Sequence, residues 1–538
     1  MAILDGLLQG RTVPLVTLVV LTPIAYILYL TIYRLFFSPL AKLPGPWLTR
    51  ISSIPEANAL KQARRAAWVT ELFEQYPGAV AVRTGPSSVS FNDPEAVKAI
   101  YGGLYYHRLL IKADENDNSG HGKAADEFGK SSWYDAFSTT GESLFSTRSK
   151  KRHAMKRRSV AHSFSAQSLA SFEPYVDMTL NKLVRRLDDF AATGEPFDIY
   201  FWFELFTMDL MGELALGDNF GVLEAGQPAR YSKLVELSQR FANMIGMLPF
   251  GKRSVQVLSW VPIPYVQMLY RARLEYLDYA RVALERRFRD DKREKVAPSG
   301  KKRQDIMQRF IEAQDPETGV KMGFDELRAE TSSLMVAGAS TGSVTMNWMT
   351  YYLCKNPAIK QSVIKQLEDM FPENISGKDP VPYTRLQHLS LLEHTELEVL
   401  RLHPPIGYAM PRDTPRQGAV IAGVYIPGDV AVGVPAASIG RNASVYPEPD
   451  SFEPDRWSGG GLGDLTRMKN CFLGFGYGSR QCIGRGVATQ FVMKTMAQVL
   501  LRYEVELEDP RLVLGTMEYT IQKPDRAYKV KLRRRGSK

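Results

Sequence analysis

Cysteine is scarce in this sequence of 538 residues. Cys354, Cys471 and Cys482 are the only three cysteines, and no two of them are spaced as Cys-x-x-Cys. An odd number of cysteines without that spacing predicts neither a disulfide framework nor a zinc site. Because free thiols are typical of reducing compartments, we expect the main part of the chain to face the cytosol.

Charged side chains are absent from residues 12–33, where leucine, valine, isoleucine and tyrosine predominate. A helix of this length is about long enough to cross a bilayer. A cleaved signal peptide is the alternative, but the apolar run is long for one and no small-residue cleavage site follows it. We therefore predict a retained single-pass anchor. Because Arg34, Lys42 and Arg50 follow it, the positive-inside bias places residues 1–11 in the lumen and the rest in the cytosol.

Recognisable nucleic-acid-binding motifs are also missing, although the net charge is +10. We expect this positive charge to favour binding to anionic lipid or to an acidic protein, and we expect no binding to nucleic acid. Hydrophobic residues (44%) and charged residues (23%) occur in the proportions of an ordinary folded protein. Residues 34–50 contain several prolines and basic residues, which predict a stiff hinge or a plain linker. Residues 51–538 show no internal repeat or compositional boundary, so we treat them as one domain.

Hydrophobic periodicity indicates where the main helices lie. Apolar residues repeat with a helical period over residues 169–190, and helical patterns also cover residues 324–356 and 389–402. Residues 79–84 and 88–91 predict a strand hairpin. Two of the motifs described next, at residues 337–341 and 398–401, lie on these expected helices.

Three motifs on these and neighbouring segments each have a plain structural interpretation. Residues 337–341 are small or hydroxylated, which is typical of tight helix packing, and no acid occurs from 331 to 366. The second motif, Glu-x-x-Arg at 398–401, is common by chance as a surface pair. His153 and Arg157 lie four apart in a basic run, and such a run usually forms a solvated face.

The most informative stretch surrounds one cysteine with glycines. Its pattern is Phe475-x-x-Gly478-x-Arg480-x-Cys482-x-Gly484. Glycine lets the backbone approach a flat ligand closely. Neighbouring arginines and the helix predicted just after the pattern lower the pKa of a thiol, which favours a thiolate metal ligand. A buried, inert thiol is the simple alternative.

This pattern matches the haem-binding signature of the cytochrome P450 family, which the sequence resembles along nearly its whole length. The anchor, the hinge, the His153/Arg157 pair, residues 337–341, the Glu-x-x-Arg pair and Phe-Glu-Pro-Asp-Arg-Trp at 452–457 occur in family order. The resemblance implies a mainly α fold with small β-sheets (α+β), the cytochrome P450 fold, preceded by a single N-terminal transmembrane helix. It also implies haem b as the cofactor, with Cys482 as the axial thiolate ligand of the iron.

The resemblance further assigns roles to individual residues. Thr341 would relay protons to bound dioxygen, and Ser340, also a candidate catalytic residue, stands where the family has an acid. The haem-binding residues would be His153, Arg157, Arg412, Phe475, Arg480, Cys482 and Gly484. A buried structural cluster would contain Glu398, Arg401 and Arg456. The candidate substrate-pocket residues are Ala337, Ile406, Tyr408 and Ala409.

The function implied is a monooxygenase that hydroxylates or epoxidises an apolar small molecule with dioxygen and electrons from NADPH. NADPH–cytochrome P450 reductase would supply the electrons, with cytochrome b5 as an optional second donor. The sequence looks most like filamentous-fungal members of secondary metabolism, single-pass proteins of the endoplasmic reticulum membrane. Ser340 keeps open a haem-thiolate enzyme that catalyses oxidative cyclisation, rearrangement or dehydration. A non-enzymatic membrane haem sensor or carrier is the remaining alternative, and Thr341 argues against it.

Overall fold

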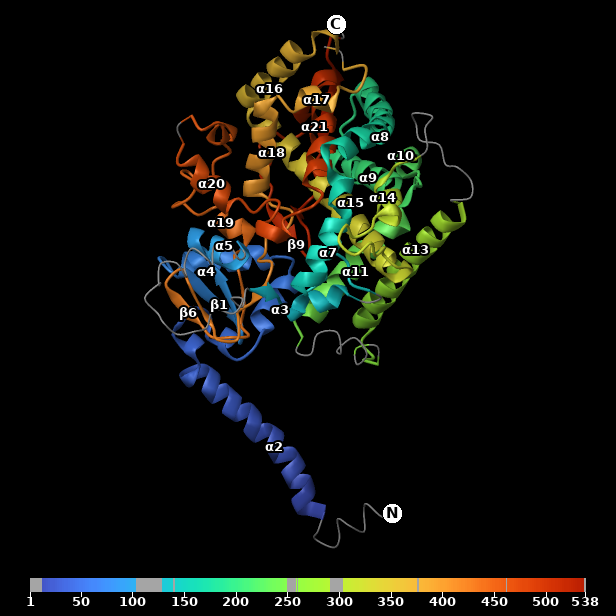
Figure 1. Cartoon of the computed structure of the whole chain (residues 1–538). Coiled ribbons are helices and arrows are strands. Elements are labelled where there is room, and N and C mark those ends of the chain that lie inside the picture. Colours follow the sequence, from blue (N-terminus) through green and yellow to red (C-terminus); the bar gives the residue numbers. More distant parts are fainter. Residues whose placement is uncertain are drawn as a thin grey trace.

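The computed structural model describes residues 12–102, 128–138, 141–248, 258, 260–290, 303–374, 377–460 and 462–536, with side chains from residue 21 onward. The predicted lumenal segment, residues 1–11, lies outside these ranges. Figure 1 shows a helix-rich body, a β-rich region at its lower left, and helix α2 (Thr12–Ile32) extending away from both.

Helices form most of the body, as the periodicity predicts. After α2 they are α3 Ile54–Lys61, α4 Arg65–Gln75, α5 Pro94–Tyr101, α7 Lys150–Ala161, α8 Ala166–Thr193, α9 Ile199–Met211, α10 Val222–Ala225, α11 Arg230–Gly246, α13 Pro264–Asp290, α14 Ile306–Glu312, α15 Phe324–Lys355, α16 Pro357–Met370, α17 Tyr383–Leu386, α18 Ser390–Leu402, α19 Ala436–Ile439, α20 Leu465–Cys471 and α21 Arg485–Arg502. The short 3₁₀ and π turns include η1 Tyr33–Phe37, η4 Ser132–Phe137, η8 Pro454–Ser458 and η9 Gly478–Arg480.

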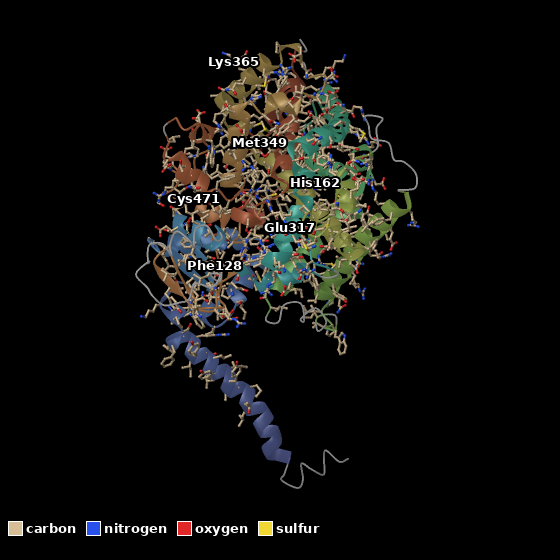
Figure 2. The ribbon with its side chains drawn as sticks, viewed as in Figure 1. Phe128, His162, Glu317, Met349, Lys365 and Cys471 are labelled. Carbon is tan, nitrogen blue, oxygen red and sulfur yellow. The ribbon has the colours of Figure 1, made fainter. Side chains whose placement is uncertain are left out.

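Two of these helices, α15 and α21, cross the centre of the body side by side. In α21 every residue from 490 to 501 is buried. This helix is therefore surrounded by other elements on all sides. In α15 the side chain of Met349 is 0% exposed, and Figure 2 shows it inside the body, with Lys365 of α16 at the edge. The two helices therefore form a fixed frame for the loop that precedes α21.

The strands form one larger sheet and three small hairpins. Their bounds are β1 Ala81–Gly85, β2 Ser88–Phe91, β3 Gly129–Lys130, β4 Arg412–Asp413, β5 Ala419–Ile421, β6 Val424–Ile426, β7 Ala431–Gly433, β8 Tyr503–Leu507, β9 Thr516–Glu518, β10 Gln522–Pro524 and β11 Val530–Arg534. The larger sheet has the order β1-β2-β7-β4-β3, and β2 pairs with β7 in parallel. Antiparallel pairing of β3 with β4 sets Lys130 opposite Arg412.

Several predicted elements are confirmed. The antiparallel pair β1–β2 is the predicted hairpin. Helices α8, α15 and α18 cover the three segments with helical periodicity. The mainly helical body with small sheets confirms that part of the predicted fold class.

Helix α2 covers the apolar run for which the sequence predicts a membrane span. Its described large apolar side chains are exposed and include Leu21, Ile24, Ile27 and Leu28. Within the described part of the chain, however, no helix combines the length and the hydropathy needed to cross a membrane. The structure therefore does not confirm the predicted transmembrane helix.

Candidate active site

A cavity of about 420 Å³ is bordered by the middle of α15 and by the cysteine loop before α21. Ala337 and Thr341 line it from α15, and Cys482 lines it from the loop. The fold thus brings together two motifs that lie far apart in the sequence. The cavity is also lined by these residues assigned from the sequence: His153, Arg157, Ile406, Tyr408, Arg412, Phe475, Arg480 and Gly484.

The cysteine loop is closed by its own backbone. The Cys482 N–H donates to the carbonyl oxygen of Phe475 at 2.8 Å. Gly478 has a φ of +69°, and a Cβ there would lie 2.0 Å from the carbonyl oxygen of Tyr101, so that only glycine fits. A Cβ at Gly484 would have the Cys482 sulfur, at 3.9 Å, as its nearest neighbour. The loop therefore leaves the space between the thiol and Gly484 free of a side chain.

The Cys482 thiol is exposed to this cavity. Burial in the protein raises its pKa, and this effect outweighs the backbone N–H of Gly484 and the guanidinium groups of Arg157 and Arg485. Nearby arginines thus lower the pKa of this thiol, as predicted, but the expectation of a net decrease is wrong because burial outweighs them. Desolvation dominates because the thiolate would lack a counter-charge in contact with it. A coordinated metal ion reverses this balance, since it deprotonates the thiol that binds it.

Basic side chains gather along one part of the cavity, which we call the cationic wall. Burial, with Arg480 and Arg412 nearby, holds the pKa of Lys130 well below its usual range. Burial and the same arginines lower the pKa of His153 to about 3, so this imidazole is neutral at physiological pH. The wall consists of Lys130, His153, Arg157, Arg412 and Arg480.

Backbone carbonyls and a phenol orient the guanidinium groups of the cationic wall. Arg157 Nη1 donates to the carbonyl oxygen of Gln481 at 2.9 Å, and Arg412 Nη1 donates to the Tyr134 hydroxyl at 2.9 Å. Arg480 Nη1 donates to the carbonyl oxygen of Thr147 at 2.9 Å. Among the described residues, neither Arg157 nor Arg412 forms an ion pair with an acidic side chain. The wall therefore suits anionic groups of a ligand, such as carboxylates.

The face of α15 toward the cavity carries a hydroxyl between two tightly packed glycines. Thr341 Oγ1 donates to the carbonyl oxygen of Ala337 at 2.8 Å, which leaves its lone pairs for a partner in the cavity. A Cβ at Gly338 would lie 2.2 Å from the Met211 sulfur, and one at Gly342 would lie 2.3 Å from the Phe491 ring. Residues 337–342 therefore combine both roles: the glycines allow close packing of α15, and Thr341 lines the cavity.

Two of the residues that the sequence assigns to catalysis or to the substrate pocket do not line this cavity. Ser340 lies on another face of α15, because successive residues of a helix turn by about 100°. Its carbonyl oxygen accepts from the Ser343 hydroxyl at 3.0 Å. Ala409 forms a β-bridge with Pro435, next to Tyr408, which does line the cavity. The catalytic role of Ser340 and the pocket role of Ala409 stay predictions without a contact to the cavity.

The described acid on α15 nearest to Thr341 is Glu330, three turns earlier, about 16 Å along the helix axis. Glu330 lines the cavity, and its Oε1 accepts from the Leu144 N–H at 2.8 Å and from Lys156 Nζ at 3.4 Å. Burial raises the pKa of Glu330 to about 7, although Lys156 opposes the shift. This carboxyl is therefore poised to exchange a proton near neutral pH.

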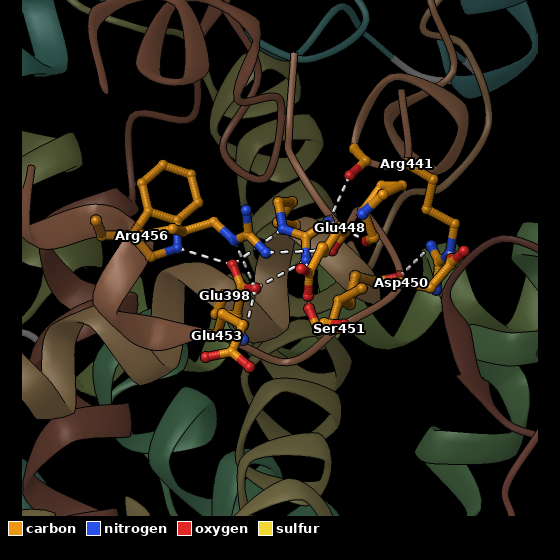
Figure 3. Close-up of polar contacts among 12 residues, drawn as sticks. Glu398, Arg441, Glu448, Asp450, Ser451, Glu453 and Arg456 are labelled. Carbon is orange, nitrogen blue, oxygen red and sulfur yellow. Dashed lines mark hydrogen bonds and ion pairs between the residues drawn. The ribbon is translucent and has the colours of Figure 1, made fainter. Parts of the chain in front are cut away.

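Glu398, Arg401 and Arg456 meet in a buried cluster away from the cavity. Figure 3 shows Glu398 beside Arg456 and Glu453. Glu398 Oε2 accepts from Arg401 Nε at 2.9 Å, and Oε1 accepts from Arg401 Nη2 at 2.7 Å and from Arg456 Nε at 2.9 Å. Trp457 Nε1 also donates to Oε2, at 2.9 Å. Because all three charged side chains are 0% exposed, the cluster joins α18 to η8 with fully desolvated bonds.

Sequence reasoning missed four acidic or basic residues of the cavity: Lys130, Arg273, Glu330 and Glu396. Glu396 is two residues before Glu398, and its Oε1 accepts from Thr489 Oγ1 at 3.2 Å. Its Oε2 has no partner among the described residues, and burial raises its pKa to about 8, so it is protonated at neutral pH. A single lysine, arginine or glutamate carries no spacing signal, so nothing in the sequence distinguished these residues.

These features test whether a haem fits the residues present. The cavity provides a thiol beside a glycine-rich loop, an apolar lining and the basic side chains of the cationic wall, whose arginines suit the two propionates of the porphyrin. Such a combination defines a site for haem with an axial cysteine thiolate.

Comparison with known proteins agrees with that class. The family model for Cytochrome P450 matches residues 112–532. Cytochrome P450 monooxygenase BipB of Cochliobolus sativus is 27% identical over 516 residues, covering 94% of this chain and 94% of that protein. Cytochrome P450 monooxygenase ORF11 of Penicillium roqueforti is 28% identical over 478 residues, covering 88% and 91%. The corresponding protein tazI of Aspergillus terreus is 27% identical over 475 residues, covering 88% of each.

The chain belongs to the cytochrome P450 family. Its enzyme class is cytochrome P450 monooxygenase, the description that these fungal relatives share.

Proposed function

We propose that this protein binds haem b through Cys482 and inserts one oxygen atom of dioxygen into a mainly apolar small molecule. The reaction would be a hydroxylation or an epoxidation in the biosynthesis of a secondary metabolite. The observation that carries the proposal is that Cys482 and Thr341, from distant segments, line one largely apolar cavity. The fungal monooxygenases that resemble the chain support it.

Each part of the site has a role in this proposal. When bound, haem would supply the iron at which dioxygen is activated. Cys482 would ligate that iron, and Arg157, Arg412 and Arg480 would hold the propionates with His153 as a neutral hydrogen-bond donor. Thr341 would take part in a proton relay by accepting a hydrogen bond from water in the cavity, because its hydroxyl donates to the Ala337 carbonyl oxygen and its lone pairs are free. Its own proton would enter the cavity once the hydroxyl turns away from Ala337.

The source of that proton is particular to this chain. A hydroxyl relays protons but does not store them at neutral pH, and no acid follows Glu330 on α15. Protons would therefore reach Thr341 through water in the cavity. Glu330, whose pKa is raised to about 7, would supply these protons to the water.

Electrons would come from NADPH through NADPH–cytochrome P450 reductase, with cytochrome b5 as a second donor. Exposed Lys151 on α7 offers positive charge to an acidic partner, whereas its neighbour Arg152 pairs with Glu142 at 3.1 Å. Helix α7 is joined to the cysteine loop by the bond from Arg157 to Gln481, so a partner there would be close to the cofactor.

We also propose attachment to the endoplasmic reticulum membrane. Large apolar side chains of α2 and η1 are exposed, including Phe36 (73%) and Phe37 (71%), and such an apolar surface favours contact with lipid. Carbonate extraction of membranes from expressing cells tests this: we expect the full chain in the pellet and a chain lacking residues 1–37 in the supernatant. A full chain that is released by carbonate contradicts attachment through this helix.

Isotopically labelled dioxygen tests the reaction itself. Membranes that contain this protein, the reductase and NADPH are incubated with extracts of candidate substrates, and the products are analysed by mass spectrometry. We expect one labelled oxygen atom in the product. A haem-dependent product without label would instead support oxidative cyclisation, rearrangement or dehydration. This is the second candidate function, because no acid lies beside Thr341 on α15.

A further inference from the structure

A further positive side chain, Arg273, lines the cavity from α13 and is separate from the cationic wall. It is 4% exposed. Arg273 Nη1 donates to the Ser238 hydroxyl of α11 at 2.9 Å, and Nη2 donates to the carbonyl oxygen of Phe137 at 3.5 Å. The third nitrogen of the guanidinium, Nε, is buried and has no hydrogen-bond partner among the described residues.

Arg273 has no acidic partner within the described part of the chain. Burial lowers its pKa, and the one group that opposes this shift is the Tyr276 phenol. Two other arginines of α13 do have acidic partners: Arg281 pairs with Asp278 at 2.8 Å, and Arg287 pairs with Asp305 at 3.2 Å. A guanidinium keeps its charge at every physiological pH, so Arg273 is a buried cation that the described protein leaves without a counter-ion.

The surroundings of Arg273 suit a ligand with acceptor oxygens. Gln239 of α11 and Thr520 line the same cavity and supply further polar groups. The Thr520 hydroxyl accepts from Asn243 Nδ2 at 2.7 Å, which fixes its position. Other lining residues of the cavity, such as Leu277 and Val336, are apolar, so they favour a hydrocarbon skeleton. A carboxylate matches both the charge and the planar donor geometry of a guanidinium.

We propose that the substrate carries a carboxylate, that this group binds Arg273, and that the apolar remainder of the molecule extends through the cavity toward Cys482. This inference rests on the proposed function, because it names the chemical class of that enzyme's substrate. Anchoring one end at α11 and α13 would decide which carbon atom lies beside Thr341. Arg273 would therefore govern the position of oxidation as well as affinity.

Matched pairs of carboxylic acids and primary amides test the proposal. The probes are dodecanoic acid, octanoic acid and naphthaleneacetic acid, each with its own amide, and binding to the full-length, haem-loaded protein is measured by calorimetry. We expect at least one acid to bind the wild type about tenfold or more tightly than its amide, as for a charge-assisted hydrogen bond. Arg273→Gln should abolish this preference, and Arg273→Lys should retain part of it.

Arg271→Gln is the matched control, because Arg271 lies on the same helix with its side chain exposed. It should leave the preference unchanged. The proposal is overturned when no acid binds the wild type more tightly than its amide, or when Arg273→Gln keeps the preference. A lowered melting temperature of Arg273→Gln with the preference intact would make Arg273 only a link between α11, α13 and η4.

The spectrum of the reduced, carbon monoxide-bound protein separates this inference from the proposed function. A wild type without the thiolate band would refute the haem-thiolate function, whatever the probes do. A wild type with that band but without a preference for acids would refute the carboxylate substrate alone.

Discussion

Substituting Glu398 by glutamine should unfold the connection between α18 and η8 and prevent stable haem binding. Glu398 accepts hydrogen bonds from Arg401, Arg456 and Trp457, as well as from the backbone N–H of Glu453 at 3.0 Å. Glutamine removes the negative charge, and its NH₂ group would face N–H donors. Two buried guanidinium groups would then lack their shared counter-ion.

The expected loss in the free energy of unfolding is about 3–5 kcal/mol, the usual cost of removing one partner of a buried ion pair. Backbone bonds limit the loss: Arg401 Nη1 also donates to Gly440 O at 2.6 Å, and Arg456 Nη1 donates to Pro447 O at 2.8 Å. The loss is nevertheless a large part of a typical total stability of about 5–15 kcal/mol. We therefore expect little haem-loaded protein at the growth temperature.

Urea titration and the haem content of the purified protein measure this effect. Glu373→Gln is the control, because it breaks an ion pair with Arg385 in which the side chains are 57% and 44% exposed. That change should cost less than about 1 kcal/mol. If Glu398→Gln retains normal haem content and loses no more stability than this control, the structural role of the cluster is refuted.

Three further substitutions follow from the cavity. Thr341→Ala should lower the product formed per NADPH consumed, because the hydroxyl that faces the cavity is lost. In the wild type, the free energy of unfolding should fall as the pH rises from 4.5 to about 7, because the Glu330 carboxyl loses its proton at a lower pH in the unfolded chain than in the folded protein. Glu330→Gln should lack this decline, and urea titration at several pH values measures both proteins. Gly342→Ala should cost about 1–3 kcal/mol of stability, because its Cβ would meet the Phe491 ring.

Each of these changes has a control or a contradicting result. Thr350→Ala is the control for Thr341→Ala, because Thr350 is buried and donates to Met346 O at 2.9 Å; it should leave the product per NADPH unchanged. A wild-type yield of product per NADPH in Thr341→Ala would contradict the proton relay. A pH-dependent decline that persists in Glu330→Gln would exclude this group as its cause. Gly323→Ala is the control for Gly342, because no atom lies within 4 Å of its added Cβ; equal effects of the two would contradict the packing argument.

Local spacing in the sequence predicts the parts of the site that lie on one element. The Glu398–Arg401 pair spans one helical turn, so its geometry follows from the helix alone. The cysteine loop is closed by a bond between Cys482 and Phe475, which are also close in sequence. The same helical geometry explains why Ser340, next to Thr341, does not line the cavity.

Tertiary packing decides the features that the sequence did not reveal. Lys130 reaches the cationic wall because β3 pairs with β4, and two-residue strands have almost no sequence signal. Arg273 lines the cavity through the packing of α13 on α11, which no motif records. The pKa of Cys482 depends on how far burial exceeds the attraction of nearby arginines, a balance that sequence neighbours alone do not give.

The most direct test of the whole account is the absorbance spectrum of the reduced protein with carbon monoxide, for the wild type, Cys482→Ser and Cys354→Ser. We expect a band at about 450 nm, the mark of thiolate-ligated haem, in the wild type and in Cys354→Ser, and its loss in Cys482→Ser. Cys354 is a fair control, because its thiol donates to Val505 O at 3.4 Å, outside the cavity. A band that persists in Cys482→Ser, or that is missing in the wild type, would contradict Cys482 as the haem ligand.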